Sequence, residues 1–539
     1  MRFLGIGAAV LVATGLVSVA SCSSSSGGGS GNNPTPDSGP SPGIDSSVPQ
    51  DSSAPAEDAG SGEDSGYVVP PGWNAPITQP TDPVATSGRA ACTFTRGAMP
   101  ASTLGTSTPL DAKIPIDNVV VIMMENRSFD TLLGHMNQAF ARTDVEEAPV
   151  GAFNPDVPSG GPDAGAAAGD AGVHPFTHAP EECFADTDHT WHGQHVSWDN
   201  GANDGFYFTN DQHDDNGNGL ADAGFDAGPP NPLYDGERAL WWYDNTDLPF
   251  EYSLANSFAI ADHYFCSTLG PTYPNRDYLV AGTSFGLTEN GFPNISANLT
   301  DNIVITDELQ QRGVSWELFT DGTPGLATVL QVGVVTRYPQ TTHAGISDFL
   351  KAAAAGTMPQ VSFVDPNIGT ADSTPTNNDQ HPPSDVQIGS FWMQQIVNAV
   401  MTSPQWAHTA LFITWDENGG EYDHVPPPAA CAPDTTAPIL AGNDVGTVGD
   451  FTRYGFRVPL IVVSPYAKKG YVGHTVYDHT SIVRFIEAKF KVPALSARDA
   501  NADPLMDLFD FSTPALLTPP TLASPIESDA GLQYCTTTY

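Results

Sequence analysis

The fold is first apparent in an apolar run, Asn118-Val119-Val120-Val121-Ile122-Met123-Met124, which is followed directly by Glu125-Asn126. A short, continuous apolar run rich in β-branched residues predicts a strand buried on both faces, as in parallel sheets. Three similar runs follow farther along the chain, at 361–364, 410–415 and 458–463. Candidate helices lie between them, including 391–401 and 481–490. This alternation predicts an α/β domain around a large, mostly parallel central sheet flanked by helices on both faces.

Polar side chains follow each of the four apolar runs. They are Glu125 and Asn126 after the first run, Asp365 after the second, Asp416 and Glu417 after the third, and Ser464 after the fourth. In open α/β sheets, ligands bind beyond the carboxyl ends of the strands. The sequence therefore predicts a functional site at this edge, although Glu125 and Asn126 could equally cap a following helix.

The segment around Asp416 has the composition of a metal site. Asp416 and Glu417 precede two glycines, which allow the backbone to turn sharply, and Asp423-His424 follows. The chain has 62 acidic and 19 basic residues, a formal charge of −43. Such a charge argues against a nucleic-acid partner, since polyanion binding needs a basic surface. If the ligand is a phosphate ester, bound divalent cations are the obvious means of neutralising it.

The segment 270–276 carries a candidate nucleophile. Its glycine and two prolines fix a turn that could present Thr272, or the earlier Ser267. Arg276 is close enough in the chain to meet a phosphate oxygen through both guanidinium nitrogens. A merely rigid loop is the alternative interpretation.

Histidines are the other candidate site residues. His189, His192 and His195 recur at intervals of three, so a helix would bring them roughly onto one face. A zinc site of three histidines is one interpretation, and histidines that lie beside a site are the commoner alternative. His381, fixed by two following prolines, suits a phosphate-contacting or acid–base role.

The first residues predict a processing signal. Arg2 precedes an apolar segment that ends at Val19-Ala20-Ser21-Cys22, which resembles the lipobox of bacterial lipoproteins. We expect residues 1–22 to be a lipoprotein signal peptide, Cys22 to be lipidated, and the protein to be exported to the cell envelope. An ordinary cleaved signal with an incidental cysteine is the alternative. No later segment offers the ~18 consecutive apolar residues of a membrane-spanning helix, so the expected anchor is lipid alone.

Composition divides the rest of the chain. Residues 23–110, which begin with a tract of Ser, Gly, Pro and Asp, are expected to be a disordered linker, because such a tract buries too little apolar surface to offset its ordering entropy. Residues 111–515 form the predicted main domain, and 516–539 a C-terminal tail. Asp-Ala-Gly-rich stretches near 156–175 and 211–232 are expected to be surface insertions.

The five cysteines that follow Cys22 are odd in number, so at least one thiol is expected to be unpaired or bridged between molecules. A calcium-loop pattern lies within the second insertion. Its matching positions are Asp214, Asn216, Asn218 and Asp222, but Phe225 stands where such loops carry a bidentate Glu. A weak structural calcium site and a solvated acidic turn are the two interpretations.

Several segments together are similar to a known family. They are ENRSFD (125–130), GPTYPNR (270–276), QHPPSD (380–385), WDENGGEYDHVPPP (415–428), and RVPLIVVSPYAKKG (457–470) with YDHTSIVRFIE (477–487). They span roughly residues 114–490. In content and order they resemble the bacterial phosphoesterase family that contains phosphatidylcholine-preferring phospholipases C and respiratory-burst-inhibiting acid phosphatases. The resemblance implies an alkaline-phosphatase-like α/β fold.

The resemblance also implies a mechanism. The implied metal ligands are Glu125, Asn126, Thr272, Asp416 and Glu417. Thr272 would be the nucleophile, while His189 and His381 would hold the phosphoryl group or protonate the leaving oxygen. Arg276 and His424 are expected to contact the substrate. The implied function is metal-dependent hydrolysis of a phosphate ester, either a phospholipid head group or a phosphomonoester, through a phosphothreonine intermediate.

Two other interpretations stay open on the sequence. Related folds hydrolyse sulfate or phosphonate esters with similar metal chemistry, although the sulfatase signature Cys/Ser-x-Pro-x-Arg is not obvious here. A surface lipoprotein could also keep the fold only to bind a ligand or a partner. The intact acidic residues and Thr272 disfavour this second alternative.

Overall fold

Strand β1 (Asn118–Met124) lies inside the main sheet of the computed structural model, between β10 and β11. The structure describes residues 70, 72–160, 172–213, 231–291, 304–321, 338–368 and 374–539. Among these residues, eight strands form the main sheet in the order β13-β6-β12-β11-β1-β10-β8-β9. The remaining strands of this sheet are β6 (Ala259–Ala261), β8 (Trp316–Thr320), β9 (Thr342–Ala344), β10 (Val361–Asp365), β11 (Thr409–Trp415), β12 (Leu460–Val463) and β13 (Val472–Gly473).

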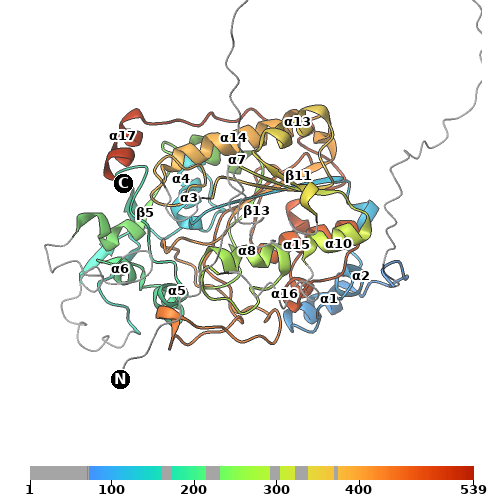
Figure 1. Cartoon of the computed structure of the whole chain (residues 1–539), viewed down its shortest axis with the longest axis horizontal. Helices are drawn as coiled ribbons and strands as arrows, with labels where there is room; N and C mark the ends of the chain where they lie inside the picture. Colours follow the sequence, from blue (N-terminus) through green and yellow to red (C-terminus); the bar gives the residue numbers. More distant parts are fainter. Residues whose placement is uncertain are drawn as a thin grey trace, which may run out of the picture. The chain divides into compact units, whose positions relative to one another are not determined.

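The centre of the sheet is parallel and apolar. Val121 of β1 pairs with Phe363 of β10 on one side and with Phe412 of β11 on the other. Every residue of β1 is buried, because helices cover both faces of the sheet. Figure 1 shows α7, α13 and α14 on one side and α8, α10 and α15 on the other. The predicted α/β class, with a mostly parallel sheet between helices, is confirmed.

The covering helices form where the sequence predicts them. The predicted segment 391–401 lies in α14 (Val386–Thr402), which begins after Asp385, whose side chain accepts a hydrogen bond from the Gln387 amide. The predicted segment 481–490 lies in α15 (His479–Phe490). The other helices of these two layers are α7 (Pro249–Ser257), α8 (Thr272–Ala281), α10 (Ile305–Arg312) and α13 (Ser347–Ala355).

Smaller elements surround this core. The short strands are β2 (Phe153–Pro155), β3 (Val173–Pro175), β4 (Thr177–His178), β5 (Trp241–Trp242), β7 (Tyr264–Phe265) and β14 (Tyr477–Asp478). The outer helices are α1 (Asp82–Ala90), α2 (Pro100–Thr103), α3 (Phe129–Leu133), α4 (Met136–Phe140), α5 (Trp191–Trp198), α6 (Phe206–Asn210), α16 (Ala497–Asn501) and α17 (Asp529–Thr538).

One strand runs against the prediction. Strand β12 pairs antiparallel with β11, so its carboxyl end lies at the opposite edge of the sheet. The Ser464 hydroxyl accordingly donates a hydrogen bond to the carbonyl of Thr409, the first residue of β11. The prediction that Ser464 joins the acids at the functional edge is wrong, because an apolar run carries no signal for strand direction.

Part of the predicted linker is folded. Helix α1 and the buried side chains of Ala85 and Leu104 lie within 82–110, and Cys92 forms a disulfide with Cys431. A disordered linker that extends to residue 110 is therefore wrong for this stretch, because its apolar residues and its cysteine pack on the domain. A second disulfide joins Cys183 to Cys535, and Cys266 is a buried free thiol, which confirms the expected unpaired cysteine.

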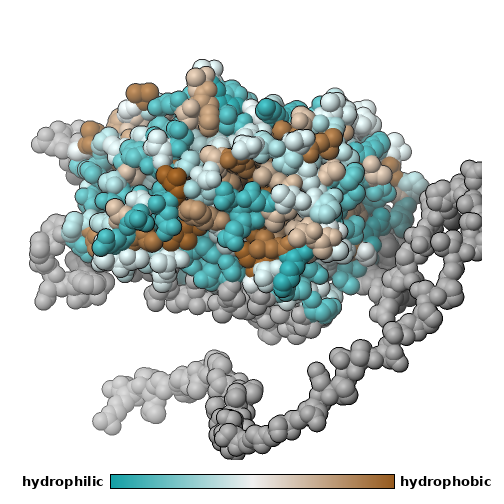
Figure 2. Space-filling view, turned by 90° about the horizontal axis from the view of Figure 1, so that it is seen from above, coloured by the Kyte–Doolittle hydropathy of each residue, from teal (hydrophilic) through white to brown (hydrophobic). Residues whose placement is uncertain are grey.

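Several sequence predictions lie wholly or largely outside the described residues. These are the signal peptide with Cys22, the predicted linker up to residue 69, the calcium-loop positions 214–222, and most of the two Asp-Ala-Gly-rich stretches. Within the described ranges, no helix has both the length and the apolar character needed to cross a membrane. In the view of Figure 2, hydrophobic residues occur as separate patches among hydrophilic ones.

Candidate active site

Three of the acids that follow the parallel strands surround one guanidinium. Arg276, in α8, donates from Nε to Glu125 Oε1 at 3.0 Å and to Asp416 Oδ2 at 3.2 Å. Its Nη1 lies 3.7 Å from Asp365 Oδ1, and Nη2 donates to the carbonyls of Met123 and Met124 at the end of β1. The sequence predicts that Arg276 contacts a phosphate oxygen. The structure gives it buried carboxylate and carbonyl partners, because α8 places it beneath the strand ends.

Two buried acids at the strand ends, Glu125 and Glu417, resist ionisation. Burial, then the charge of the neighbouring Asp416, raises the pKa of Glu125 well above its usual value, and Arg276 offsets this only in part. Burial likewise raises the pKa of Glu417, although the nearby His189 opposes the shift. Carboxylates packed this closely lose their protons readily only when a cation shares the site.

Two side chains supply unsatisfied ligand atoms. Neither Oδ1 nor Nδ2 of Asn126 has a hydrogen-bond partner among the described residues, and Glu417 Oε1 has none there either. All three atoms are buried. The Asn126 backbone adopts φ 53° and its amide donates to Asp416 Oδ1 at 3.0 Å. A buried polar atom without a partner is costly. The oxygens of Asn126 and Glu417 therefore fit a bound divalent cation.

The two glycines after Asn418 make the turn that the sequence predicts. Gly419 and Gly420 have φ of 66° and 69°, a region that side chains rarely adopt. A Cβ on Gly419 would lie 2.5 Å from the Asn126 carbonyl oxygen, and one on Gly420 would overlap the Asp188 carbonyl oxygen. The glycines thus allow the segment after β11 to contact the segments that carry Asn126 and His189.

Thr272 is the first residue of α8 and is buried. Asn275 fixes the preceding loop, because its side chain accepts from the Thr268 amide and donates to the Gly270 carbonyl. Gln194 Nε2 donates both to the Gly270 carbonyl, at 3.2 Å, and to Glu417 Oε2, at 2.8 Å. Gln194 therefore connects the nucleophile loop to the acids after β11, and the helix N-terminus favours an anion beside Thr272.

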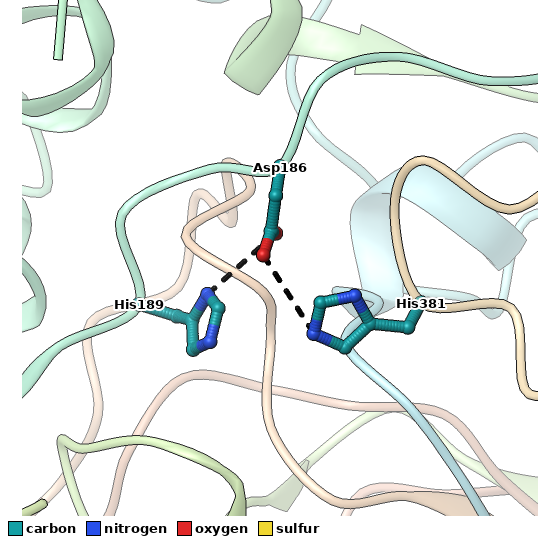
Figure 3. A group of neighbouring side chains, drawn as sticks. All are labelled: Asp186, His189 and His381. Atoms are coloured by element: carbon teal, nitrogen blue, oxygen red, sulfur yellow. Dashed lines mark ion pairs between the residues drawn. The ribbon is translucent and has the colours of Figure 1, made fainter. Parts of the chain in front are cut away.

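His189 and His381 lie on separate loops and meet at Asp186 (Figure 3). Asp186 Oδ1 is 3.7 Å from His189 Nδ1, and Asp186 Oδ2 is 3.7 Å from His381 Nε2. The two imidazole rings are 5.7 Å apart and nearly perpendicular. Such a group can hold a metal or can hold a proton between two imidazoles.

The three spaced histidines do not form one site. Thr190 caps α5, its side chain accepting from the Gly193 amide, so His189 lies before the helix. His192 Nδ1 instead contacts Thr447 Oγ1, and His195 Nδ1 contacts the Trp191 carbonyl. The three-histidine zinc interpretation is wrong, because the helix begins two residues after the first histidine.

His424 belongs to another charged cluster. Its Nδ1 lies 2.6 Å from Asp130 Oδ2, and Arg457 pairs with both Asp130 and Asp423. Burial lowers the pKa of His424, but the hydrogen bond and charge of Asp130 outweigh burial and raise the pKa overall. His424 Nε2 also lies 4.0 Å from Glu146 Oε1. The expected contact of His424 with the substrate stays a prediction.

Sequence reasoning missed Asp186 and Gln194 as site residues. The only signal for Asp186 is its position three residues before His189. Gln194 carries no chemical signal in the sequence, because an uncharged amide on a helix is common. Its role depends on contacts with segments 76 and 223 residues away in the chain.

The comparisons with known proteins agree with this chemistry. A model of the Phosphoesterase family matches residues 116–493. "Phospholipase C A" of Mycobacterium tuberculosis is 31% identical over 459 residues, covering 76% of this chain and 80% of the relative. "Non-hemolytic phospholipase C" of Pseudomonas aeruginosa is 29% identical over 453 residues and covers 77% and 60%. "Non-specific phospholipase C1" of Arabidopsis thaliana is 28% identical over 405 residues and covers 72% and 69%.

A solved structure from Vibrio parahaemolyticus, described as a protein in the alkaline phosphatase superfamily, is also similar. It shares 12% identity at a TM-score of 0.31, covering 48% of this chain and 64% of that chain. A score this low supports no further argument. The family model covers more than half of the chain and the first relative exceeds 30% identity. The chain therefore belongs to the Phosphoesterase family, hydrolases that act on phosphoester bonds.

Proposed function

We propose that this protein is a metal-dependent hydrolase of the phospholipase C or acid phosphatase type, with Thr272 as its nucleophile. The observation that carries the proposal is the pair of unsatisfied oxygens, on Asn126 and Glu417, beside the buried carboxylates of Glu125 and Asp416. These four residues, with Thr272, would hold the cation. Bound there, a divalent cation would supply Lewis acidity and lower the pKa of a coordinated hydroxyl.

The residues of the chain suit in-line displacement at phosphorus. The Thr272 hydroxyl first loses its proton to solvent, and its Oγ1 then attacks the phosphorus atom, so that the bond to the leaving oxygen breaks and a phosphothreonine forms. His189 or His381 donates a proton to the leaving oxygen, and the same group then takes a proton from the water that hydrolyses the phosphothreonine. The hydroxyl of this water bonds to phosphorus, the bond between phosphorus and Oγ1 breaks, and Thr272 is restored as its alkoxide, so one ester and one water are consumed in each cycle.

The names of the relatives favour a phospholipid substrate. The phospholipase C names of the relatives from M. tuberculosis and A. thaliana support phospholipid hydrolysis to a diacylglycerol and a phosphorylated head group. A phosphomonoester is the alternative substrate. We also propose export and lipid anchoring through Cys22, supported by the apolar N-terminus and the lipobox-like sequence.

The test compares two esters and two substitutions. Full-length protein is assayed with p-nitrophenyl phosphate and p-nitrophenylphosphorylcholine, with and without chelator. Thr272→Ala is expected to lower kcat by about a thousandfold or more, because no other hydroxyl replaces the nucleophile, whereas Thr272→Ser keeps substantial turnover. Wild-type turnover by a folded Thr272→Ala variant would rule out the assignment, and turnover that persists in chelator would rule out the metal.

A further inference from the structure

The end of the chain contacts the loop that carries Asp186 and His189. Residues 528–539, which include α17 and are called the C-terminal clamp below, form the red helix at the C-terminus in Figure 1. Cys535 of the clamp is disulfide-bonded to Cys183, three residues before Asp186. The Tyr539 side chain lies close to the backbone of Ala185. The clamp therefore holds the histidine-bearing loop immediately before its catalytic residues.

The same clamp contacts the segment that carries His381. The Ser528 amide donates to Gln387 Oε1 at 2.9 Å, in the first turn of α14, which follows the His381 loop directly. The Glu182 carbonyl accepts from the Val386 amide at 3.1 Å and joins the two loops. The Glu182 carboxylate packs against Gly531 of the clamp, where an added Cβ would overlap its oxygens. The clamp thus covers the junction between the loops of both histidines.

Arg238 holds the same loop through different contacts. Its guanidinium is buried and donates to the carbonyl of Ala185 at 3.1 Å and to that of Asp186 at 3.0 Å. The backbone between Cys183 and Asp186 is therefore fixed by a covalent bond, by the clamp and by Arg238. This backbone sets where the Asp186 carboxylate meets both imidazoles.

We propose that the C-terminal clamp positions Asp186, and through it His189 and His381, for phosphoryl transfer, so that Cys183 and Cys535 are positioning residues of the active site. The inference rests on the proposed function. Misplacement of a catalytic group by about 1 Å can cost about a hundredfold in rate. Release of the clamp would therefore lower kcat more than it alters KM.

The chain provides a matched control in its second disulfide. Cys183–Cys535 and Cys92–Cys431 have sequence separations of 352 and 339 residues, so loss of either releases nearly the same loop entropy in the unfolded chain. Cys92–Cys431 attaches the region of α1 rather than a histidine loop. The two pairs thus separate general stabilisation from active-site positioning.

The experiment measures kcat, KM and Tm of the full-length chain with whichever ester the wild type hydrolyses. The Cys183→Ala/Cys535→Ala variant is expected to lose about tenfold or more in kcat with KM within about twofold of wild type. The Cys92→Ala/Cys431→Ala variant should show a comparable fall in Tm and wild-type kcat. Equal kcat in the two variants would overturn the proposal.

A second measurement applies if the first variant does not fold. The Cys92→Ala/Cys431→Ala variant keeps the Cys183–Cys535 bond. In the experiment this bond is reduced while the protein stays folded, and its opening is followed by counting free thiols. We expect kcat to fall as this bond opens and to recover on reoxidation, whereas unchanged kcat after full reduction refutes the positioning role. Failure of the wild type to hydrolyse any ester would instead reject the proposed function.

Discussion

At the scale of single residues, Asp186 connects the two histidines of the proposed site. Its two oxygens each lie 3.7 Å from an imidazole nitrogen. In the proposed mechanism one of these rings donates a proton to the leaving oxygen, and the carboxylate supplies a negative charge beside it. An uncharged residue of the same shape would leave the rings in place without this charge.

We therefore predict that Asp186→Asn lowers kcat by about tenfold to a hundredfold, because the proposed proton donor loses the negative charge beside it. The measurement is steady-state hydrolysis of the preferred ester. Asp156→Asn is the matched control, since Asp156 pairs with His174 at 2.5 Å on the β2–β3 hairpin. A comparable loss in both variants would show that the effect is not specific to the site.

His424 gives a prediction about stability and pH. Its pKa is raised in the folded protein despite burial, because Asp130 favours the charged ring. The resulting stabilisation is complete below the ordinary histidine pKa and is lost as the pH rises through the raised pKa. The difference in Tm between wild type and His424→Asn should therefore be larger near pH ~6 than near pH ~8.5. A difference that grows with pH would contradict the assigned ion pair.

At the scale of elements, the sequence predicts the strands and their polar ends but not every direction or partner. The run 118–124 forms β1, and the acids at the ends of β1, β10 and β11 meet at one edge of the sheet as expected. The predicted direction of β12 is wrong, because the direction of a strand depends on the path of the chain between elements. The sequence predicts a substrate contact for Arg276, because an arginine near a candidate nucleophile suggests phosphate binding. Its carboxylate partners are distant in the chain, because Glu125 lies 151 residues before Arg276 and Asp416 lies 140 residues after it.

The need for glycine in the turn after β11 can be tested by substitution. Gly420→Ala would force a side chain into φ 69° and against the Asp188 carbonyl, next to His189. We expect a loss of about 1–3 kcal/mol in the free energy of unfolding and a fall in kcat. Denaturant unfolding and turnover measure the two effects. Gly446→Ala is the control, because its φ is 101° but no atom lies within 4 Å of the added Cβ; it should leave kcat unchanged.

At the scale of the whole molecule, the buried acids couple cation binding to the stability of the domain. Burial raises the pKa values of Glu125 and Glu417 above the ordinary 4.5. The cation-free folded domain then keeps protons that the unfolded chain releases. Its free energy of unfolding therefore falls as the pH rises. A cation that binds the ionised carboxylates acts in the opposite sense.

The rise in Tm on adding a divalent cation to chelator-treated protein should consequently be larger near pH ~8 than near pH ~5. Differential scanning fluorimetry with separate additions of Mg²⁺, Ca²⁺, Mn²⁺ and Zn²⁺ checks this and identifies the preferred ion. The Glu125→Gln/Glu417→Gln variant should lose most of the shift. A shift of equal size in that variant would place the cation elsewhere.

The two disulfides also give the chain an unusual connectivity. Their cysteines alternate along the sequence, in the order Cys92, Cys183, Cys431, Cys535, so the two covalent loops interleave instead of nesting. Every peptide bond between Cys92 and Cys535 is therefore bypassed by at least one sulfur bridge. A protease that makes a single cut in this stretch would produce two polypeptides that cannot separate while the bridges are intact. This connectivity would keep a nicked molecule in one piece.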